Sequence, residues 1–150
     1  MTYVPLQEQA REWGPAKTYP WRVLVVCVLV NKTHRGPAGR VARKLFEQWP
    51  SPELLANARA ASVMTLMRPL GLTRRALLLQ HLSASMVGVR TGRDLKRRGR
   101  QVSDLPGCGQ FAQDAWAIFV EGRRDLEPAD RVLAEWLDHL ETTNQEEPDA

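Results

Sequence analysis

The sequence has few of the features that mark secreted, membrane-embedded or disulfide-stabilised proteins. It contains only two cysteines, Cys27 and Cys108, too few for a disulfide framework or a four-cysteine metal site. The longest uninterrupted apolar run, residues 23–30, is too short to cross a bilayer. No charged start followed by an apolar stretch and a small-residue cleavage site opens the chain. We therefore expect a cytoplasmic protein that makes no membrane contact.

Charge is distributed unevenly along the chain. Residues 1–120 carry 18 basic and 7 acidic side chains, a net charge of +11, whereas residues 121–150 carry 3 and 10, a net charge of −7. Arginine supplies 17 of the 21 basic residues, and its forked guanidinium suits contact with phosphate. A basic body with an acidic end favours a polyanionic partner, although a solvated basic surface has the same composition.

Apolar spacing predicts an all-α fold of about seven or eight helices with short connections. The apolar run after Pro20 is interpreted as a buried central helix, because the chain has no second candidate strand to pair with it. Ser51-Pro52-Glu53 predicts a capped helix start. We expect Thr73 to cap a further helix that carries Ala76, Leu77, Leu79, Leu82 and Met86.

Two segments lack an apolar period. Residues 88–101 are expected to form a basic connecting loop that carries Arg93, Lys96, Arg97, Arg98 and Arg100. If this loop meets a nucleic acid, it should add affinity that depends on salt and not on sequence.

A last helix is expected to start near Pro128. Residues 1–141 would then form a single domain, followed by an acidic disordered tail over residues 142–150.

The hairpin Leu105-Pro106-Gly107-Cys108-Gly109 is the most informative stretch. Two glycines two positions apart let the backbone approach a ligand without interference from side chains. The helix expected over residues 110–120 offers unpaired N–H groups at its start. Gly107, Cys108, Gly109 and Gln110 are therefore candidates for binding a DNA phosphate, whereas an ordinary helix–helix turn would need only the glycines.

Four further motifs accompany the hairpin in a fixed order. They are Leu6-Gln7-Glu8, Pro20-Trp21-Arg22-Val23-Leu24, Leu29-Val30-Asn31-Lys32-Thr33 and Pro69-Leu70-Gly71-Leu72. With the hairpin, they resemble the helix-hairpin-helix (HhH-GPD) DNA glycosylase superfamily over roughly residues 5–140. Within it they are similar to the mismatch-specific thymine glycosylase domains of methyl-CpG-binding repair proteins. The resemblance implies the helix-hairpin-helix glycosylase fold.

The same resemblance assigns roles to individual residues. It places the catalytic carboxylate at Asp130, 21 residues after Gly109, although an acid in the first turn of a helix also has a purely structural role. Such a carboxylate can stabilise an oxocarbenium-like sugar and orient water. Gln7 and Phe111 would line the base pocket. Lys32 and Leu72, or alternatively Leu70, would fill the space that a flipped base leaves, although Leu70 and Leu72 equally suit a core contact.

The chain departs from its relatives at two positions. Lyase-type relatives have a nucleophilic lysine where this chain has Phe111, so the resemblance implies a monofunctional enzyme. Thymine-specific relatives have tyrosine there, and a lysine where this chain has Val132. No cysteine follows Cys108, so no iron–sulfur cluster is expected. A monovalent cation at the hairpin is common in the superfamily, and no other cofactor is implied.

These features favour a monomeric DNA glycosylase of base excision repair. Its partner would be double-stranded DNA with a thymine, uracil or 5-substituted uracil, mispaired with guanine, and its product an abasic site. Two alternatives stay open: a glycosylase-like enzyme of phage thymine hypermodification, and a non-catalytic helix-hairpin-helix DNA-binding protein. The cell would be prokaryotic or phage-infected.

Overall fold

The computed structural model describes residues 3–31, 33–71 and 73–146, and within these ranges it contains helices and no strand. The all-α expectation is therefore confirmed. The α-helices are α1 (Leu6–Gln9), α2 (Tyr19–Val30), α3 (Arg35–Gln48), α4 (Pro52–Ala56), α5 (Ala60–Met67), α6 (Arg75–Ser85), α7 (Gly92–Arg97), α8 (Gln110–Ala115) and α9 (Arg131–Glu146). Short 3₁₀ segments are η1 (Ala10–Trp13), η2 (Ala16–Thr18), η3 (Arg68–Leu70) and η4 (Val102–Asp104), and α8 continues into a π-helical turn, η5 (Trp116–Val120).

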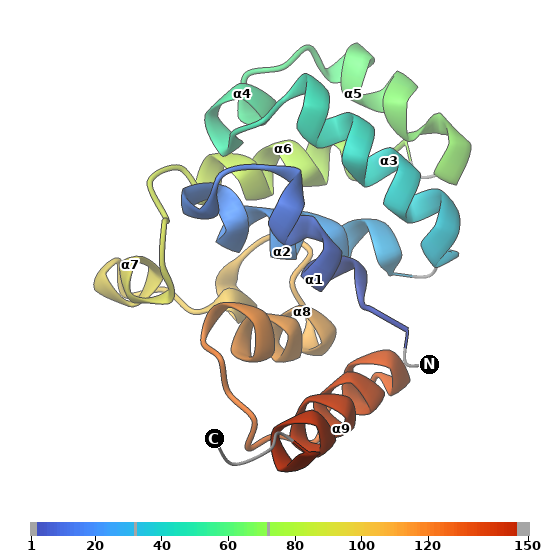
Figure 1. The fold of residues 1–150 in the computed structure, drawn as a ribbon. Coiled ribbons are helices and arrows are strands. Elements are labelled where there is room, and N and C mark those ends of the chain that lie inside the picture. Colours follow the sequence, from blue (N-terminus) through green and yellow to red (C-terminus); the bar gives the residue numbers. More distant parts are fainter. Residues whose placement is uncertain (1–2, 32, 72, 147–150) are drawn as a thin grey trace.

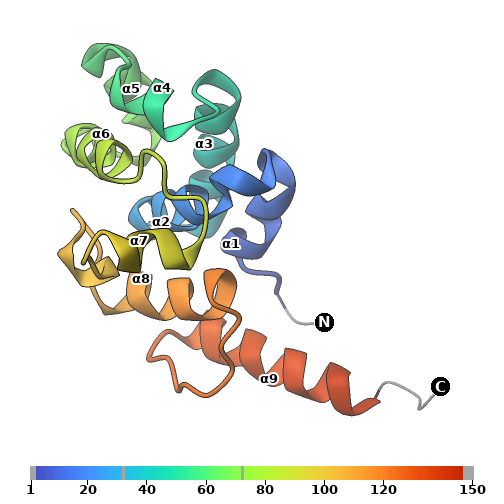
Figure 2. The same cartoon turned by 90° about the vertical axis from the view of Figure 1, so that its left-hand side faces the viewer.

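Helix α2 lies at the centre of the molecule (Figure 1), and each of its twelve residues is buried. It contacts α1, α3, α6, α8 and η5. A helix that is apolar on all sides is stable only when neighbours cover every side. Helices α3 to α6 lie on one side of α2, and α8 and α9 lie on the other (Figures 1 and 2).

Trp21 joins three of these helices. Its side chain is completely buried, its ring meets Phe46 of α3 edge to face at 5.2 Å, and its indole N–H donates to Ser83 Oγ of α6 at 2.9 Å. The expectation that Trp21 belongs to the core is confirmed. An indole that buries its body and satisfies its N–H fixes the spacing of the helices around it.

Arg22 fastens the N-terminal segment to α2. Its guanidinium is 1% exposed and donates to the carbonyl oxygens of Ala10 and Pro15, the second at 2.7 Å. A charge this deep is tolerated only where carbonyl oxygens replace water. Tyr19 adds a second fastening, because its hydroxyl donates to the Gln7 carbonyl at 2.8 Å. The segment that carries Gln7 is therefore held in a fixed place.

Some helix boundaries differ from those expected. Ser51 does cap α4, accepting from Leu54 N at 3.2 Å, but Thr73 was wrongly expected to cap α6. Helix α6 starts at Arg75 without a side-chain cap, because a turn separates Thr73 from it. Leu77 of the same helix is 54% exposed, whereas Ala76 and Leu79 are buried.

The last helix starts and ends later than expected. Helix α9 begins at Arg131, because Asp130 caps it, and not near Pro128. It continues to Glu146, past residue 141, where the acidic tail was expected to begin. Of the described helices, none is long and apolar enough to cross a membrane.

Candidate active site

Asp130 lies at the N-terminus of α9 and acts as its N-cap. Its Oδ2 accepts from the Leu133 N–H at 3.0 Å, and its main-chain oxygen accepts from the Ala134 N–H at 3.0 Å. The carboxylate thus satisfies one of the unpaired donors at the start of the helix and lies at the positive end of the helix dipole. Its side chain is 26% exposed, so the second oxygen remains within reach of a ligand.

Arg35, the first residue of α3, supplies a charge to that second oxygen. Its Nη2 lies 3.5 Å from Asp130 Oδ1, and its side chain is 34% exposed. The pair joins residues far apart in the sequence. The Leu133 N–H binds one carboxylate oxygen of Asp130, and the Arg35 guanidinium lies beside the other. Together they orient the carboxylate.

Gln7 of α1 contacts one of the two buried thiols, that of Cys27 on α2. Gln7 is 3% exposed, and its Nε2 donates to Cys27 Sγ at 3.4 Å. Burial raises the pKa of Cys27 to about 12, and the charges of Cys108 and Asp130 add to the rise, whereas the Gln7 hydrogen bond opposes it. The fold therefore brings Gln7 of α1 against Cys27 of α2. Both thiols are protonated at neutral pH, which excludes them as nucleophiles.

The hairpin that precedes α8 depends on a glycine at position 107. Gly107 has a φ of +73°, and a Cβ there would lie 2.7 Å from Leu78 Cδ2 and 3.4 Å from Val28 Cγ2. Only glycine suits both this backbone conformation and this contact. Gly109 precedes the first residue of α8, and nothing lies within 4 Å of a Cβ built on it. The expected turn is therefore present, open at Gly109 and packed at Gly107, and its binding to phosphate stays a prediction.

Phe111 and Gln110 occupy the first turn of α8. Gln110 is exposed, and its Nε2 donates to Asp114 Oδ1 at 2.9 Å. Phe111 is half-buried and packs in part against the core. An aromatic ring at this position offers an apolar surface and no amine.

Three known proteins have sequences similar to that of this chain. The methyl-CpG-binding domain protein 4-like protein of Arabidopsis thaliana is 33% identical over 123 residues, which are 81% of this chain and 26% of that protein. A thymine-DNA glycosylase of Aeropyrum pernix is 34% identical over 61% of this chain and 41% of its own length. A thymine/uracil-DNA glycosylase of Pyrobaculum aerophilum is 34% identical over 62% of this chain and 40% of its own length. The chain thus spans between about a quarter and two fifths of these relatives, and no family model matches it.

Solved structures share the fold. A thermostable thymine-DNA glycosylase superposes with a TM-score of 0.61 over 79% of this chain and 56% of that chain, at 22% identity. An endonuclease III, solved as a trapped covalent intermediate with DNA, superposes with a TM-score of 0.63 over 84% of this chain and 60% of that chain, at 19% identity. The chain therefore has the helix-hairpin-helix glycosylase fold, and its sequence is similar to those of thymine-DNA glycosylases.

The ion pair of Asp130 is made with an element that the resemblance did not indicate. Position 132, where the thymine-specific relatives carry a lysine, is a half-buried valine. The cation that pairs with Asp130 comes instead from Arg35 on α3. Sequence inspection missed Arg35, because it is one of 17 arginines and its partner lies on a distant helix.

The predicted wedge residues are only partly described by the structure. Lys32 and Leu72 lie outside the described residues. Leu70, at the end of η3, packs part of its side chain against the core. Arg75, which sequence inspection also missed, donates from Nη1 to the carbonyl oxygens of Val28 at 2.8 Å and Asn31 at 2.6 Å. It therefore anchors the end of α2, directly before position 32.

The segment expected as a basic loop is in fact helical over α7. Asp94 Oδ2 accepts from the N–H groups of Arg90 at 2.8 Å and Thr91 at 3.0 Å, which completes a capping box, and Leu95 is buried. The capping box and the burial of Leu95 stabilise α7 as a helix, although the segment has no apolar period.

The basic side chains of this segment are exposed, but they do not surround Asp130. In Figure 1, α7 lies at the left edge, whereas the first residue of α3 and the first turn of α9 lie at the right. Arg98 is occupied by the end of α6, because it donates to the carbonyl oxygens of Ser85 and Val87. DNA contact by Arg93, Lys96, Arg97, Arg98 and Arg100 stays a prediction.

The reactivity of the two buried thiols, Cys27 and Cys108, can be used to test their burial and their raised pKa values. Burial raises the pKa of Cys108, like that of Cys27, to about 12. The unfolded thiol has a pKa of about 8.5, so the folded protein favours the protonated form, and this contribution to stability is lost as pH rises from about 8.5 towards 12.

At pH 8 we expect iodoacetamide to leave both cysteines unmodified in the native protein, because a buried thiol is a poor nucleophile. In guanidinium chloride both should react to completion. Mass spectrometry of timed samples measures the difference. Rapid native alkylation of Cys108 would contradict the burial of the hairpin thiol.

Proposed function

We propose that the protein is a monofunctional DNA glycosylase that hydrolyses the N-glycosidic bond of a flipped pyrimidine. The observation that carries the proposal is the environment of Asp130. Its side chain is 26% exposed, the Leu133 N–H binds one carboxylate oxygen, and the Arg35 guanidinium lies beside the other. The names of the relatives, thymine-DNA glycosylase and thymine/uracil-DNA glycosylase, support the same activity.

In the proposed reaction the target nucleotide leaves the base stack before chemistry begins. The bond between the sugar C1′ and the base nitrogen breaks, and its electron pair departs with the base. Positive charge develops on the sugar, where Asp130 can stabilise it. Water then adds to C1′, and its proton neutralises the departing base or the carboxylate. The products are a free base and an abasic site in an intact strand.

Phe111 supports the monofunctional assignment. A strand-cleaving lyase needs an amine that attacks the sugar and forms a Schiff base, and a phenyl ring cannot do so. For the substrate we propose thymine, uracil or 5-substituted uracil opposite guanine, in keeping with the relatives' names. Gln7 would read the Watson–Crick edge of the base, since an amide offers a donor and an acceptor.

Incubation with duplexes that hold G·T, G·U or 5-hydroxymethyluracil, followed by hot alkali, tests the proposal. We expect strand breaks at the target position only after alkali, and no covalent adduct when borohydride is present. Breaks without alkali, together with a borohydride-trapped adduct, would contradict the monofunctional assignment. Binding without base release would indicate a DNA-binding module. A mass increase of the target base, given a donor, would indicate group transfer.

Arg35 should affect the chemical step more than DNA binding. Arg35→Ala removes the guanidinium beside Asp130 Oδ1 and leaves the carboxylate held on one side only. We expect about a 10-fold lower single-turnover rate with little change in DNA affinity, and partial recovery in Arg35→Lys.

Arg43→Ala is the matched control for this variant, because Arg43 is exposed on the same helix and should leave the rate unchanged. An Arg35→Ala enzyme with the rate of the wild type would show that the ion pair plays no part in orienting Asp130.

A further inference from the structure

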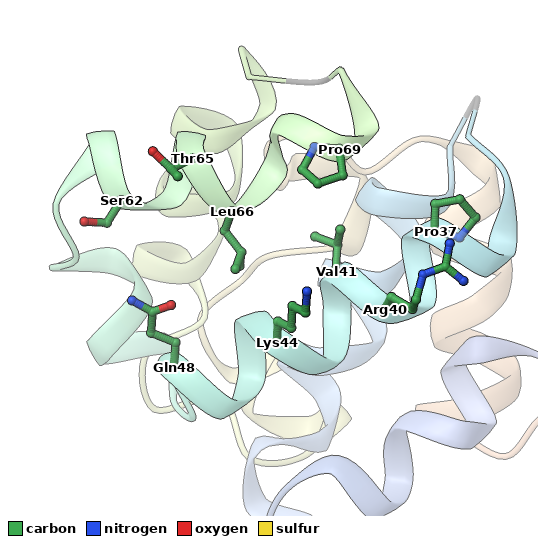
Figure 3. Close-up of a pocket in the computed structure, with 9 residues that line it drawn as sticks. All are labelled: Pro37, Arg40, Val41, Lys44, Gln48, Ser62, Thr65, Leu66 and Pro69. Carbon is green, nitrogen blue, oxygen red and sulfur yellow. The ribbon is translucent and has the colours of Figure 1, made fainter.

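A groove runs between α3 and α5 on the side of α3 away from α2 (Figure 3). It encloses about 500 Å³. Its walls combine basic, small polar and apolar side chains, and none of the lining residues is acidic. Its polar lining residues are Arg40, Lys44, Gln48, Ser62 and Thr65, and its apolar ones include Val41 and Leu66.

Two cations of this groove have no ionic partner. Arg40 and Lys44 are exposed, and in the described part of the chain neither lies in an ion pair, unlike Arg35, Arg97, Arg123 and Arg131. Figure 3 shows the Lys44 ammonium directed into the space between the two helices. Uncompensated cations beside neutral hydrogen-bonding side chains favour an anionic ligand.

The spacing of the cations favours an anion that repeats. Arg40 and Lys44 are four residues apart on one helix, so their Cβ atoms lie about 5–6 Å apart on the same face. Two such side chains can contact neighbouring phosphates of one strand. The groove is also open along its length, which suits a polymer better than a small enclosed anion.

The position of the groove relates it to Asp130. Arg35, the partner of Asp130, is the first residue of the helix that carries both cations. At 1.5 Å per residue, Lys44 lies about 13 Å further along α3 than Arg35. A nucleic-acid strand rises about 3.4 Å per nucleotide, so the same distance corresponds to about four nucleotides.

We propose that this groove binds the sugar–phosphate backbone of the DNA about four nucleotides from the target base, through Arg40 and Lys44. The proposal rests on the proposed function for its ligand. It adds a second contact region to the hairpin, on a different pair of helices, and it gives the bound duplex a direction along α3.

Fluorescence anisotropy with labelled duplexes tests the groove. Each duplex carries a tetrahydrofuran abasic analogue opposite guanine, which cannot be hydrolysed. One duplex extends ten nucleotides on both sides of the analogue, and two others are trimmed to two nucleotides on one side. The proteins are the wild type, the double variant Arg40→Gln/Lys44→Gln and the matched control Arg43→Gln, whose side chain is exposed on α3 but does not line the groove.

For the wild type, we expect one of the two trimmed duplexes to bind about 10-fold more weakly than the long duplex. The double variant should bind the long duplex about as weakly, should be insensitive to that trimming, and should show a salt slope lower by about two. Arg43→Gln should behave like the wild type. Thermal unfolding should be unchanged in both variants, because the substituted side chains are exposed.

Three results would overturn the inference. The double variant could match the wild type on every duplex, Arg43→Gln could lose as much affinity as the double variant, or the wild type could bind none of the duplexes. Failure of the proposed function is distinguishable, because it appears as absent base release in the alkali assay while the groove-dependent binding persists.

Discussion

Asp130→Asn should lower the single-turnover rate of base release by about 10²–10³-fold while leaving the fold and DNA binding intact. The substitution removes the negative charge that would face the sugar cation. It retains an oxygen for the Leu133 N–H, and asparagine caps helices about as well as aspartate. Gel analysis after hot alkali measures the rate, and chemical unfolding should agree with the wild type within about 0.5 kcal/mol.

A control on the same helix sharpens this comparison. Asp138→Asn removes an exposed acid of α9 that lies two turns from Asp130, and it should leave the rate unchanged. If the Asp130→Asn enzyme retained a tenth or more of its activity, Asp130 would be a structural cap and the catalytic assignment would be wrong. Alanine at position 130 is less informative, because it removes the cap and the charge together.

Trp21→Ala should lower the free energy of unfolding by about 3–5 kcal/mol, the largest stability effect that we expect from a single substitution. The indole is completely buried, packs on Phe46 and donates to Ser83 Oγ. Its loss leaves a cavity where α2, α3 and α6 meet. Domains of this size have a free energy of unfolding of about 5–15 kcal/mol, so the substitution should remove a large fraction of it.

Guanidinium unfolding monitored by far-UV circular dichroism measures this effect. Trp21→Phe keeps a ring and loses the hydrogen bond, so it should be affected less than Trp21→Ala. A cost below about 1.5 kcal/mol for Trp21→Ala would mean that the neighbouring helices close the cavity, and that Trp21 does not set their spacing.

The central architecture was predictable because it follows from local patterns. The apolar run of α2 predicted a buried helix because no second candidate strand could pair with it, and Ser51-Pro52-Glu53 marks a helix start by its own chemistry. Helix α7 was missed because a capping box with a single buried leucine gives no apolar period. Its stability comes from packing against other elements, which a local pattern does not contain.

The candidate site was predictable only where the resemblance marked it. Asp130 and the hairpin glycines occupy recognisable motifs, and the structure shows Asp130 as the cap of α9. The role of Arg35 comes from the tertiary approach of α3 to α9, and nothing in the residues around it signals a partner. The same holds for Arg75, whose target carbonyls belong to another helix.

The acidic character of α9 has a consequence for the direction from which DNA can arrive. Behind Asp130, the exposed carboxylates of Glu135, Asp138 and Glu141 continue along the helix. Arg131 pairs with Glu135 at 2.9 Å, so Asp138 and Glu141 are left to repel a duplex that lies lengthwise on α9. Only the tip of the helix, where Arg35 offsets the charge, can face the duplex closely. The acidic side chains of α9 would thus allow DNA to approach only the N-terminal end of the helix. Higher ionic strength would weaken this repulsion.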